Sequence, residues 1–215
     1  MAGGTPSSPR FPSPVSPRTP RRAAFIHAGV VTAALLPLAN LALRAATERL
    51  GADPVEDITH TTGDWALRLL LASLAITPLR RLLGLSDLAP LRRSLGLVAF
   101  LYATVHALTY VGLDQGFHWQ LLLEDVLKRR YVTAGFAAWL CLLPLAATST
   151  RRSMRRLGGA RWTQLHRLIH VAALLACIHY FWLVKTDLLP PFVYAAALAV
   201  LWLARLSLPG KEPIR

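Results

Sequence analysis

Apolar residues along the chain come in six blocks of about bilayer-spanning length, separated by short polar segments. The blocks cover residues 24–44, 64–83, 95–113, 132–148, 162–184 and 190–208. A helix needs about 20 mostly apolar residues to cross the hydrocarbon core of a membrane. The second block is the weakest, because Arg68 interrupts it and Pro78 lies near its end. The pattern therefore predicts an all-α integral membrane protein, a bundle of six transmembrane helices.

Composition supports this prediction and limits what else the chain can contain. Of its 215 residues, 54% are hydrophobic and only 16% are charged, which is too apolar for an ordinary soluble domain. We expect one transmembrane domain over residues 23–209, a Pro-, Ser- and Arg-rich disordered tail over 1–22 and a short tail over 210–215. A signal peptide is the rival interpretation of the first apolar block, but its spanning length favours a helix. Cys141 and Cys177 fall inside apolar blocks and are expected to act as small apolar residues.

The net charge of +13 is concentrated in connections between the blocks rather than on one face. Basic residues cluster in the segments 10–22, 80–93, 151–161 and 205–215, which share one side if six helices alternate in direction. Short basic loops stay in the cytoplasm, so both termini are expected to be cytoplasmic. The cluster Lys128–Arg129–Arg130 is a local exception on the outer side. This distribution indicates that the basic residues set the orientation of the helices in a lipid membrane. It does not favour nucleic-acid binding.

Two histidines in different apolar blocks are expected at similar depth in the outer half of the membrane. His106 lies about twelve residues into the third block and His179 about seventeen into the fifth, and both blocks run outward. Two facing neutral imidazoles are suited to axial ligation of one haem iron, because a metal bond satisfies a ring nitrogen that hydrocarbon cannot. Small residues of the third block, among them Gly96, Ala99 and Ala103, are expected to leave a slot for the macrocycle.

His166 predicts a second station nearer the cytoplasm. It precedes His179 by 13 residues, roughly 20 Å of helix rise. It is therefore a candidate ligand of an inner haem, or else a second haem ligand. An ideal helix leaves the two side chains about 140° apart, so they share a face only if the helix is bent or bulged. The matching position of the third block holds Arg93, so no opposing histidine is visible. His170, one turn after His166, is a candidate for a supporting hydrogen bond or a propionate contact.

From spacing alone, two alternatives to haem ligation stay open. Histidines inside a membrane can be hydrogen-bonded between helices, or they can form the proton relay of a small transporter. The chain has no glycine-rich nucleotide-binding motif, so it is not expected to take hydride from a nicotinamide by itself.

Four stretches of the sequence resemble the MsrQ (YedZ) family, within the ferric-reductase-like transmembrane group. They are GADPVEDITHTTGDWALRLLLASLAITPLRR, RRSLGLVAFLYATVHALTY, the TST after the fourth block and WTQLHRLIHVAALLACIHYFWLVK. The resemblance implies a six-helix protein of the bacterial inner membrane with one or two b-type haems, and FMN is also attributed to the family. The family histidines fall on His106, His166 and His179, while His170 stands where an aromatic residue is expected.

The same resemblance implies an electron-transfer subunit rather than a complete enzyme. Electrons would come from the quinol pool or a cytoplasmic flavin reductase and pass to MsrP, a periplasmic molybdopterin enzyme that reduces methionine sulfoxide. The methionine sulfoxide chemistry would thus lie on the partner. A stand-alone ferric or quinone reductase remains the alternative within redox chemistry.

The polar segment GADPVEDITHTTGDW, residues 51–65, is expected to be an outer loop. It carries several acidic residues and His60, so it is a candidate docking or outer-haem element. Without a ligand it would be a solvated loop in which Asp64 caps the second helix.

Overall fold

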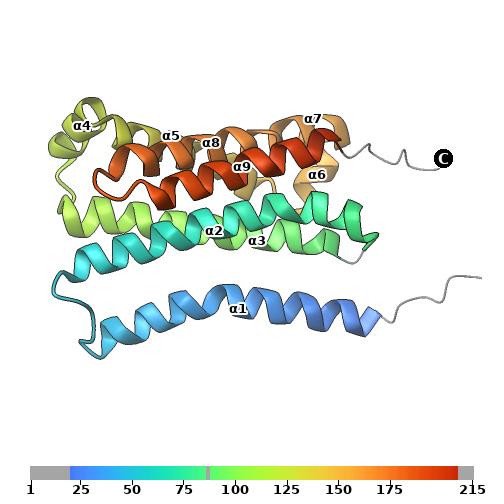
Figure 1. Cartoon of the computed structure of the whole chain (residues 1–215), viewed down its shortest axis with the longest axis horizontal. Helices are drawn as coiled ribbons and strands as arrows, with labels where there is room; N and C mark the ends of the chain where they lie inside the picture. The colour runs from blue at the N-terminus through green and yellow to red at the C-terminus, as the bar shows by residue number, and fades with distance from the viewer. Residues whose placement is uncertain (1–19, 86–87, 208–215) are drawn as a thin grey trace, which may run out of the picture.

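Long helices run side by side along the longest axis of the molecule (Figure 1). The computed structural model describes residues 20–85 and 88–207, with side chains from Ala24 onward. These residues form α1 (Pro20–Ala46), α2 (Pro54–Leu83), α3 (Ala89–Thr109), the π-helical turn η2 (Tyr110–Asp114), α4 (Trp119–Lys128), α5 (Arg130–Ala147), α6 (Arg151–Leu157), α7 (Gly159–His166), α8 (Leu168–Leu183) and α9 (Leu189–Ser207). The described ranges contain no strand, which confirms the all-α prediction.

Five helical segments are long and apolar enough to cross a membrane by length and composition. They are Ala24–Ala46, Ala89–Asp114, Arg130–Ala147, Gly159–Leu183 and Leu189–Ser207, and they correspond to five of the six expected spans. The sixth, α2, is the longest helix and runs beside α3 in the same bundle (Figure 1), but it is less apolar. Its buried leucines contribute to the core. The chain is a multi-pass membrane protein, and the five spans together with α2 are consistent with the six long helices expected.

Helix α2 begins ten residues earlier than its apolar block. The expected outer loop is therefore wrong for most of residues 51–65, and Asp64 does not cap the helix. Asp53 does, since its carboxylate accepts the backbone N–H of Glu56 at 3.0 Å, and Pro54 occupies the first helical position, where its missing N–H costs nothing. Thr62, in the polar part of the helix, is fully buried. These turns are helical because a neighbouring helix covers one side of them, which their composition does not reveal.

The C-terminal end of α1 and the N-terminal end of α2 are tied by charge. The Arg44 guanidinium donates to the Asp57 carboxylate at 2.5 Å, and the same carboxylate accepts the backbone N–H of Gly51 at 3.1 Å. The Gly51 hydrogen bond and the positive charge of Arg44 hold the pKa of Asp57 below its ordinary value. These contacts fix the turn that returns the chain into the bundle.

The N-terminal boundary differs slightly from expectation. Helix α1 begins at Pro20, so the last three residues of the expected 1–22 tail are helical. The remainder of that tail and the expected tail over 210–215 lie outside the described residues.

Basic residues from separate connections meet at one end of the bundle. The C-terminal ends of α2 and α9, the N-terminal end of α3 and helices α6 and α7 all lie there (Figure 1). At the opposite end, two members of the exceptional cluster are neutralised within α4: Lys128 contacts Glu124 at 3.0 Å and Arg129 contacts Asp125 at 3.2 Å. The asymmetry of charge between the two ends is thus larger than residue counts suggest.

Tyr102 joins α3 to the backbone of α1. Its side chain is fully buried, and its hydroxyl donates to the carbonyl of Ala34 at 3.0 Å while accepting the N–H of Leu38 at 2.8 Å. A regular helix joins those two backbone groups to each other, and Pro37 lies between them. The hydroxyl therefore serves as a polar anchor where the proline disturbs the helical ladder.

The substitution Tyr102→Phe tests this anchor. We expect it to lower the free energy of unfolding by about 1–3 kcal/mol, because two buried backbone groups lose a partner. Denaturant unfolding of the purified chain in detergent measures the change. Tyr180→Phe is the control, since no hydrogen bond from its hydroxyl is seen among the described residues; equal stability of the two variants would contradict the anchor.

Candidate functional site

The structure brings two of the histidines singled out in the sequence, His106 and His179, together near one end of the bundle. His106 projects from α3 and His179 from α8, and their ring centroids lie 6.1 Å apart with the ring planes at 82°. Antiparallel neighbours surround the pair, with α2 beside His106 and α5 beside His179. The two imidazoles thus lie at one depth, in the half of the bundle away from the arginine-rich end.

Both rings use the same nitrogen to hold their orientation. The Nδ1 atom of His106 lies 3.0 Å from the carbonyl oxygen of Thr59, and that of His179 lies 2.7 Å from the carbonyl oxygen of Tyr131. A carbonyl only accepts hydrogen bonds, so each Nδ1 carries the proton and donates. The Nε2 atom of each neutral ring then keeps its lone pair, which is the state that binds a metal.

Two glycines make room for these rings. A Cβ atom added at Gly63 of α2 would lie 3.0 Å from Cε1 of His106, and one added at Gly135 of α5 would lie 2.8 Å from Nδ1 of His179. Glycine inside a helix costs about 1 kcal/mol relative to alanine. At both positions the missing side chain is what lets an imidazole reach a backbone carbonyl of the neighbouring helix.

The separation of the pair matches coordination of a single metal between the rings. Metal–nitrogen bonds to histidine are about 2 Å long, and the ring centroid lies about 1 Å beyond the nitrogen, so two trans imidazoles have centroids roughly 6 Å apart. The observed 6.1 Å agrees with this value. Rotation of a ring about its metal–nitrogen axis leaves the distance unchanged, so the angle between the planes is compatible with ligation. The residues present therefore fit a site at which both imidazoles would hold one metal.

His166 lies at the other end of the bundle, in a different environment. Its Nδ1 atom is 3.0 Å from the carbonyl oxygen of Trp162, one turn earlier, and the indole of Trp162 stacks on its ring at 3.8 Å. The Nε2 atom is buried and has no hydrogen-bond partner among the described residues. A buried ring nitrogen without a partner costs free energy, so this atom is one of the polar groups that a ligand could satisfy.

The helix that carries His166 and His179 is interrupted between them. Helix α7 ends at His166 and α8 begins at Leu168. At Arg167 the backbone hydrogen bonds span three residues instead of four, since the N–H of Arg167 donates to the carbonyl of Gln164 and that of His170 to the carbonyl of Arg167. The sequence required a bent or bulged helix for the two histidines to share a face, and an interruption of this kind is present.

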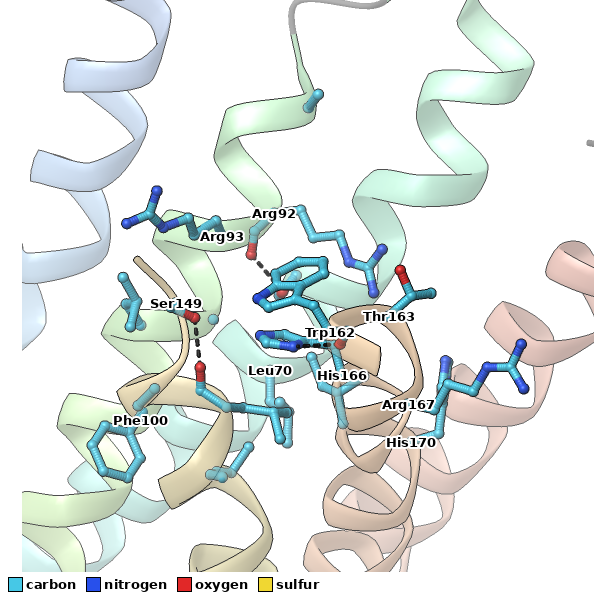
Figure 2. A pocket seen from close by; sticks show the side chains of 18 of the residues that line it. Leu70, Arg92, Arg93, Phe100, Ser149, Trp162, Thr163, His166, Arg167 and His170 are labelled. Carbon is cyan, nitrogen blue, oxygen red and sulfur yellow. Dashed lines mark hydrogen bonds between the residues drawn. The ribbon is translucent and has the colours of Figure 1, made fainter. Parts of the chain in front are cut away.

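A cavity of about 390 Å³ opens beside His166 at the basic end (Figure 2). Figure 2 shows the Trp162 indole lying over the His166 imidazole, with Arg92 reaching in from α3 beside them. The indole N–H donates to the carbonyl of Thr148 at 3.0 Å, so the TST segment after α5 holds this wall in place. Gly96, expected to leave a slot in the outer half, instead lines this cavity.

The other two candidate histidines do not join either ligand position. His170 is half-buried and lines the same cavity, where its Nδ1 atom accepts the indole N–H of Trp202 at 3.0 Å. His60 is exposed at the outer end of α2, 3.7 Å from the carboxylate of Glu56. Its neighbour Thr59 supplies the carbonyl that holds His106.

Sequence reasoning missed the residues that orient the pair. Thr59 and Tyr131 act through backbone carbonyls, and no side-chain pattern reports a carbonyl. Gly63 and Gly135 had a visible signal, because an isolated glycine inside a helical segment often marks close packing. What the glycines admit could be identified only once α2 and α5 were seen beside the histidines.

Comparison with known proteins places the chain among ferric-reductase-like proteins. Residues 62–177 match the family model described as ferric reductase like transmembrane component. The chain is 52% identical over 183 residues to the protein-methionine-sulfoxide reductase heme-binding subunit MsrQ of Xanthomonas axonopodis pv. citri, covering 82% of each chain. It is 49% identical to the MsrQ of Rhodospirillum rubrum, covering 82% of this chain and 85% of that one. It is 46% identical to the MsrQ of Herminiimonas arsenicoxydans, covering 87% of each.

Replacing a helical glycine by alanine ordinarily stabilises a helix, but the packing around His179 predicts the opposite at Gly135. Gly135→Ala is expected to lower the free energy of unfolding by about 1–3 kcal/mol, because the new methyl group overpacks the ring. Gly29→Ala on α1, where the added Cβ meets no atom within 4 Å, should instead be neutral or stabilise by up to about 1 kcal/mol. Denaturant unfolding in detergent compares the two, and stabilisation by Gly135→Ala would contradict the close fit.

Proposed function

The chain belongs to the MsrQ family of ferric-reductase-like transmembrane proteins, and we propose that it is the haem-binding, electron-transferring membrane subunit of a protein-methionine-sulfoxide reductase system. The observation that carries the proposal is the pair His106 and His179, 6.1 Å apart, each with Nδ1 bound to a backbone carbonyl. Relatives about 50% identical are named heme-binding subunits of this system.

In this proposal the cofactor at the outer end is b-type haem, with His106 and His179 as its axial ligands. Haem supplies a centre that accepts and releases one electron at a time. The chain contributes the two Nε2 lone pairs, fixes both ring orientations through Thr59 and Tyr131, and keeps two helices close through glycine. A carbonyl that accepts the Nδ1 proton of a ligating histidine raises the basicity of its other ring nitrogen.

The station at the basic end is proposed to hold a second redox group. The buried, unpartnered Nε2 atom of His166 supports ligation or hydrogen bonding there, and the cavity beside it is of cofactor size. A second haem and FMN are the two groups that the family suggests for it. For a haem, no described histidine lies opposite His166, so any second ligand would be a group other than a described histidine.

We further propose the orientation and partners of the subunit. The arginine-rich end would face the cytoplasm of a bacterial cell, with both termini there, and would receive electrons from quinol or a cytoplasmic flavin reductase. The outer pair would then lie toward the periplasm, where the MsrP molybdopterin subunit reduces methionine sulfoxide. The division of charge between the two ends supports this direction.

The exposed start of α2 is the proposed docking edge for the periplasmic partner. His60 and Glu56 are about two-thirds exposed, and the neighbouring Thr59 holds His106 through its carbonyl. A partner that covers this edge would approach the outer pair closely, and the acidic side chains would steer it by charge.

The ligand pair predicts a simple spectral result. His106→Ala and His179→Ala are each expected to abolish haem binding between the two rings. In each variant only one of the two proposed iron ligands remains. Reduced-minus-oxidised spectra and haem quantification on the purified chain measure this loss. His118→Ala, an exposed histidine near the same end, is the control.

A retained haem with unchanged spectrum and midpoint potential in either variant would show that the pair is not the ligand set. A colourless unmodified chain would remove the haem proposal altogether and favour histidines that relay protons. His166→Ala tests the inner station separately, since it should leave the spectrum of the outer pair intact.

The docking edge is tested by a combined Glu56→Gln and His60→Gln variant. We expect electron transfer to the purified partner to fall about three- to tenfold at low ionic strength, and less at high salt, with haem content unchanged. Glu124→Gln, an exposed acid of α4 at the same end, is the control. An unchanged transfer rate, or an equal fall in the control, would sink the docking assignment.

A further inference from the structure

Hydrogen-bond donors converge on the cavity at the basic end without matching acceptors. Its lining includes five arginines, namely Arg80, Arg92, Arg93, Arg167 and Arg205. None of the five forms an ion pair with a described carboxylate, and the described residues that line the cavity include no aspartate or glutamate. Arg80, Arg93 and Arg167 are exposed, as basic residues at a membrane surface are expected to be, so the two arginines that need an explanation are Arg92 and Arg205, which are partly buried.

The protonation of His170 sharpens this observation. Its Nδ1 atom lies 3.0 Å from the indole nitrogen of Trp202, which can only donate. The Nε2 atom of the same ring lies 3.2 Å from the Arg205 guanidinium, and a guanidinium also only donates. A neutral imidazole accepts at only one of its nitrogens, so Trp202 and Arg205 cannot both donate to His170, and one of these two donors lacks its acceptor there.

The arginines cannot relieve this arrangement by losing a proton. Guanidinium stays charged at any pH that proteins meet, and both Arg92 and Arg205 are half-buried. A partly buried charge without a counter-charge is costly, whereas guanidinium groups bind carboxylate and phosphate through two parallel hydrogen bonds. The missing component of this cluster is an anion with two or more acceptor oxygens.

We propose that Arg92, Arg205 and His170 form an oxyanion site that holds the phosphate or carboxylate group of a ligand in this cavity. The volume of about 390 Å³ falls within the range of small-molecule sites, so the ligand extends beyond the anionic group. Its remainder would lie beside Trp162 and His166, which line the cavity. The site is separate from the outer pair and does not depend on what that pair binds.

The test compares anionic probes with neutral counterparts on the full chain. FMN is paired with riboflavin, haem with its dimethyl ester, and phosphatidylglycerol nanodiscs with phosphatidylcholine nanodiscs. Fluorescence and absorbance titrations measure the first two pairs, and the unfolding temperature measures the third. We expect the anionic member of at least one pair to be preferred, by about tenfold in affinity for a soluble probe or by a higher unfolding temperature for the lipid. The preferred pair identifies the source of the oxyanion.

Two variants and a control connect that preference to the cluster. Arg92→Gln and Arg205→Gln should each remove most of it while leaving binding of the neutral counterpart unchanged. Arg155→Gln, an exposed arginine of α6 that does not line the cavity, should preserve it. Inorganic phosphate should displace the preferred soluble probe from the unmodified chain, which provides a measurement that no folding defect can affect.

The proposal is overturned if no anionic probe is preferred over its neutral counterpart on the unmodified chain. It is equally overturned if the preference persists in a folded double variant that lacks both Arg92 and Arg205. Loss of the preference in Arg155→Gln to the same extent would show a general effect of net charge instead of a site.

Discussion

A neutral imidazole buried in a membrane has two ring nitrogens to satisfy, and at the outer end a backbone carbonyl satisfies one of them on each ring. The bonds from Nδ1 of His106 to Thr59 and from Nδ1 of His179 to Tyr131 fix the tautomer and leave both Nε2 lone pairs available. Much of the local structure serves these bonds. Helix α2 must extend far enough outward to present Thr59, and α5 must begin close enough to α8 to present Tyr131. Gly63 and Gly135 must lack side chains for the rings to fit.

The early start of α2 shows how one helix can be both structural and functional. Its first three turns are polar, because they lie where the bundle meets water, and its next four turns are leucine-rich and buried. A helix surrounded by other helices does not need the apolar surface that lipid requires, which explains why α2 is less apolar than the other spans. The same polar turns carry the acidic side chains that we assign to docking, so the element that orients a ligand also presents a surface toward the outside.

Length and hydropathy were sufficient to predict the six long helical segments, because bilayer thickness determines how long an apolar block must be, but they gave no sign of the short helices α4 and α6. The depth of His106 and His179 followed from counting residues along helices of known direction. The break at Arg167 could not be predicted; the sequence showed only that His166 and His179 would need a bent or bulged helix to share a face. A shift from four-residue to three-residue backbone hydrogen bonds has no strong side-chain signature. The extension of α2 was missed because residues 51–65 have the composition of a loop until a covering neighbour is known. Thr59 and Tyr131 were not predictable at all, because their contribution is made by atoms that every residue has.

The two ends of the bundle differ in whether their polar groups are already satisfied. At the end that holds His106 and His179, each histidine proton has an acceptor within the chain, and in the proposed function a metal between the two rings would use the remaining nitrogens. At the basic end Arg92, Arg205 and His170 line a cavity whose described lining includes no carboxylate, and the Nε2 atom of His166 nearby has no hydrogen-bond partner among the described residues. Arginines that serve only topology can stay in water, where they keep their hydration. Partial burial of two of them around a cavity is costly without a counter-charge, and an anionic ligand of the kind proposed above would offset that desolvation.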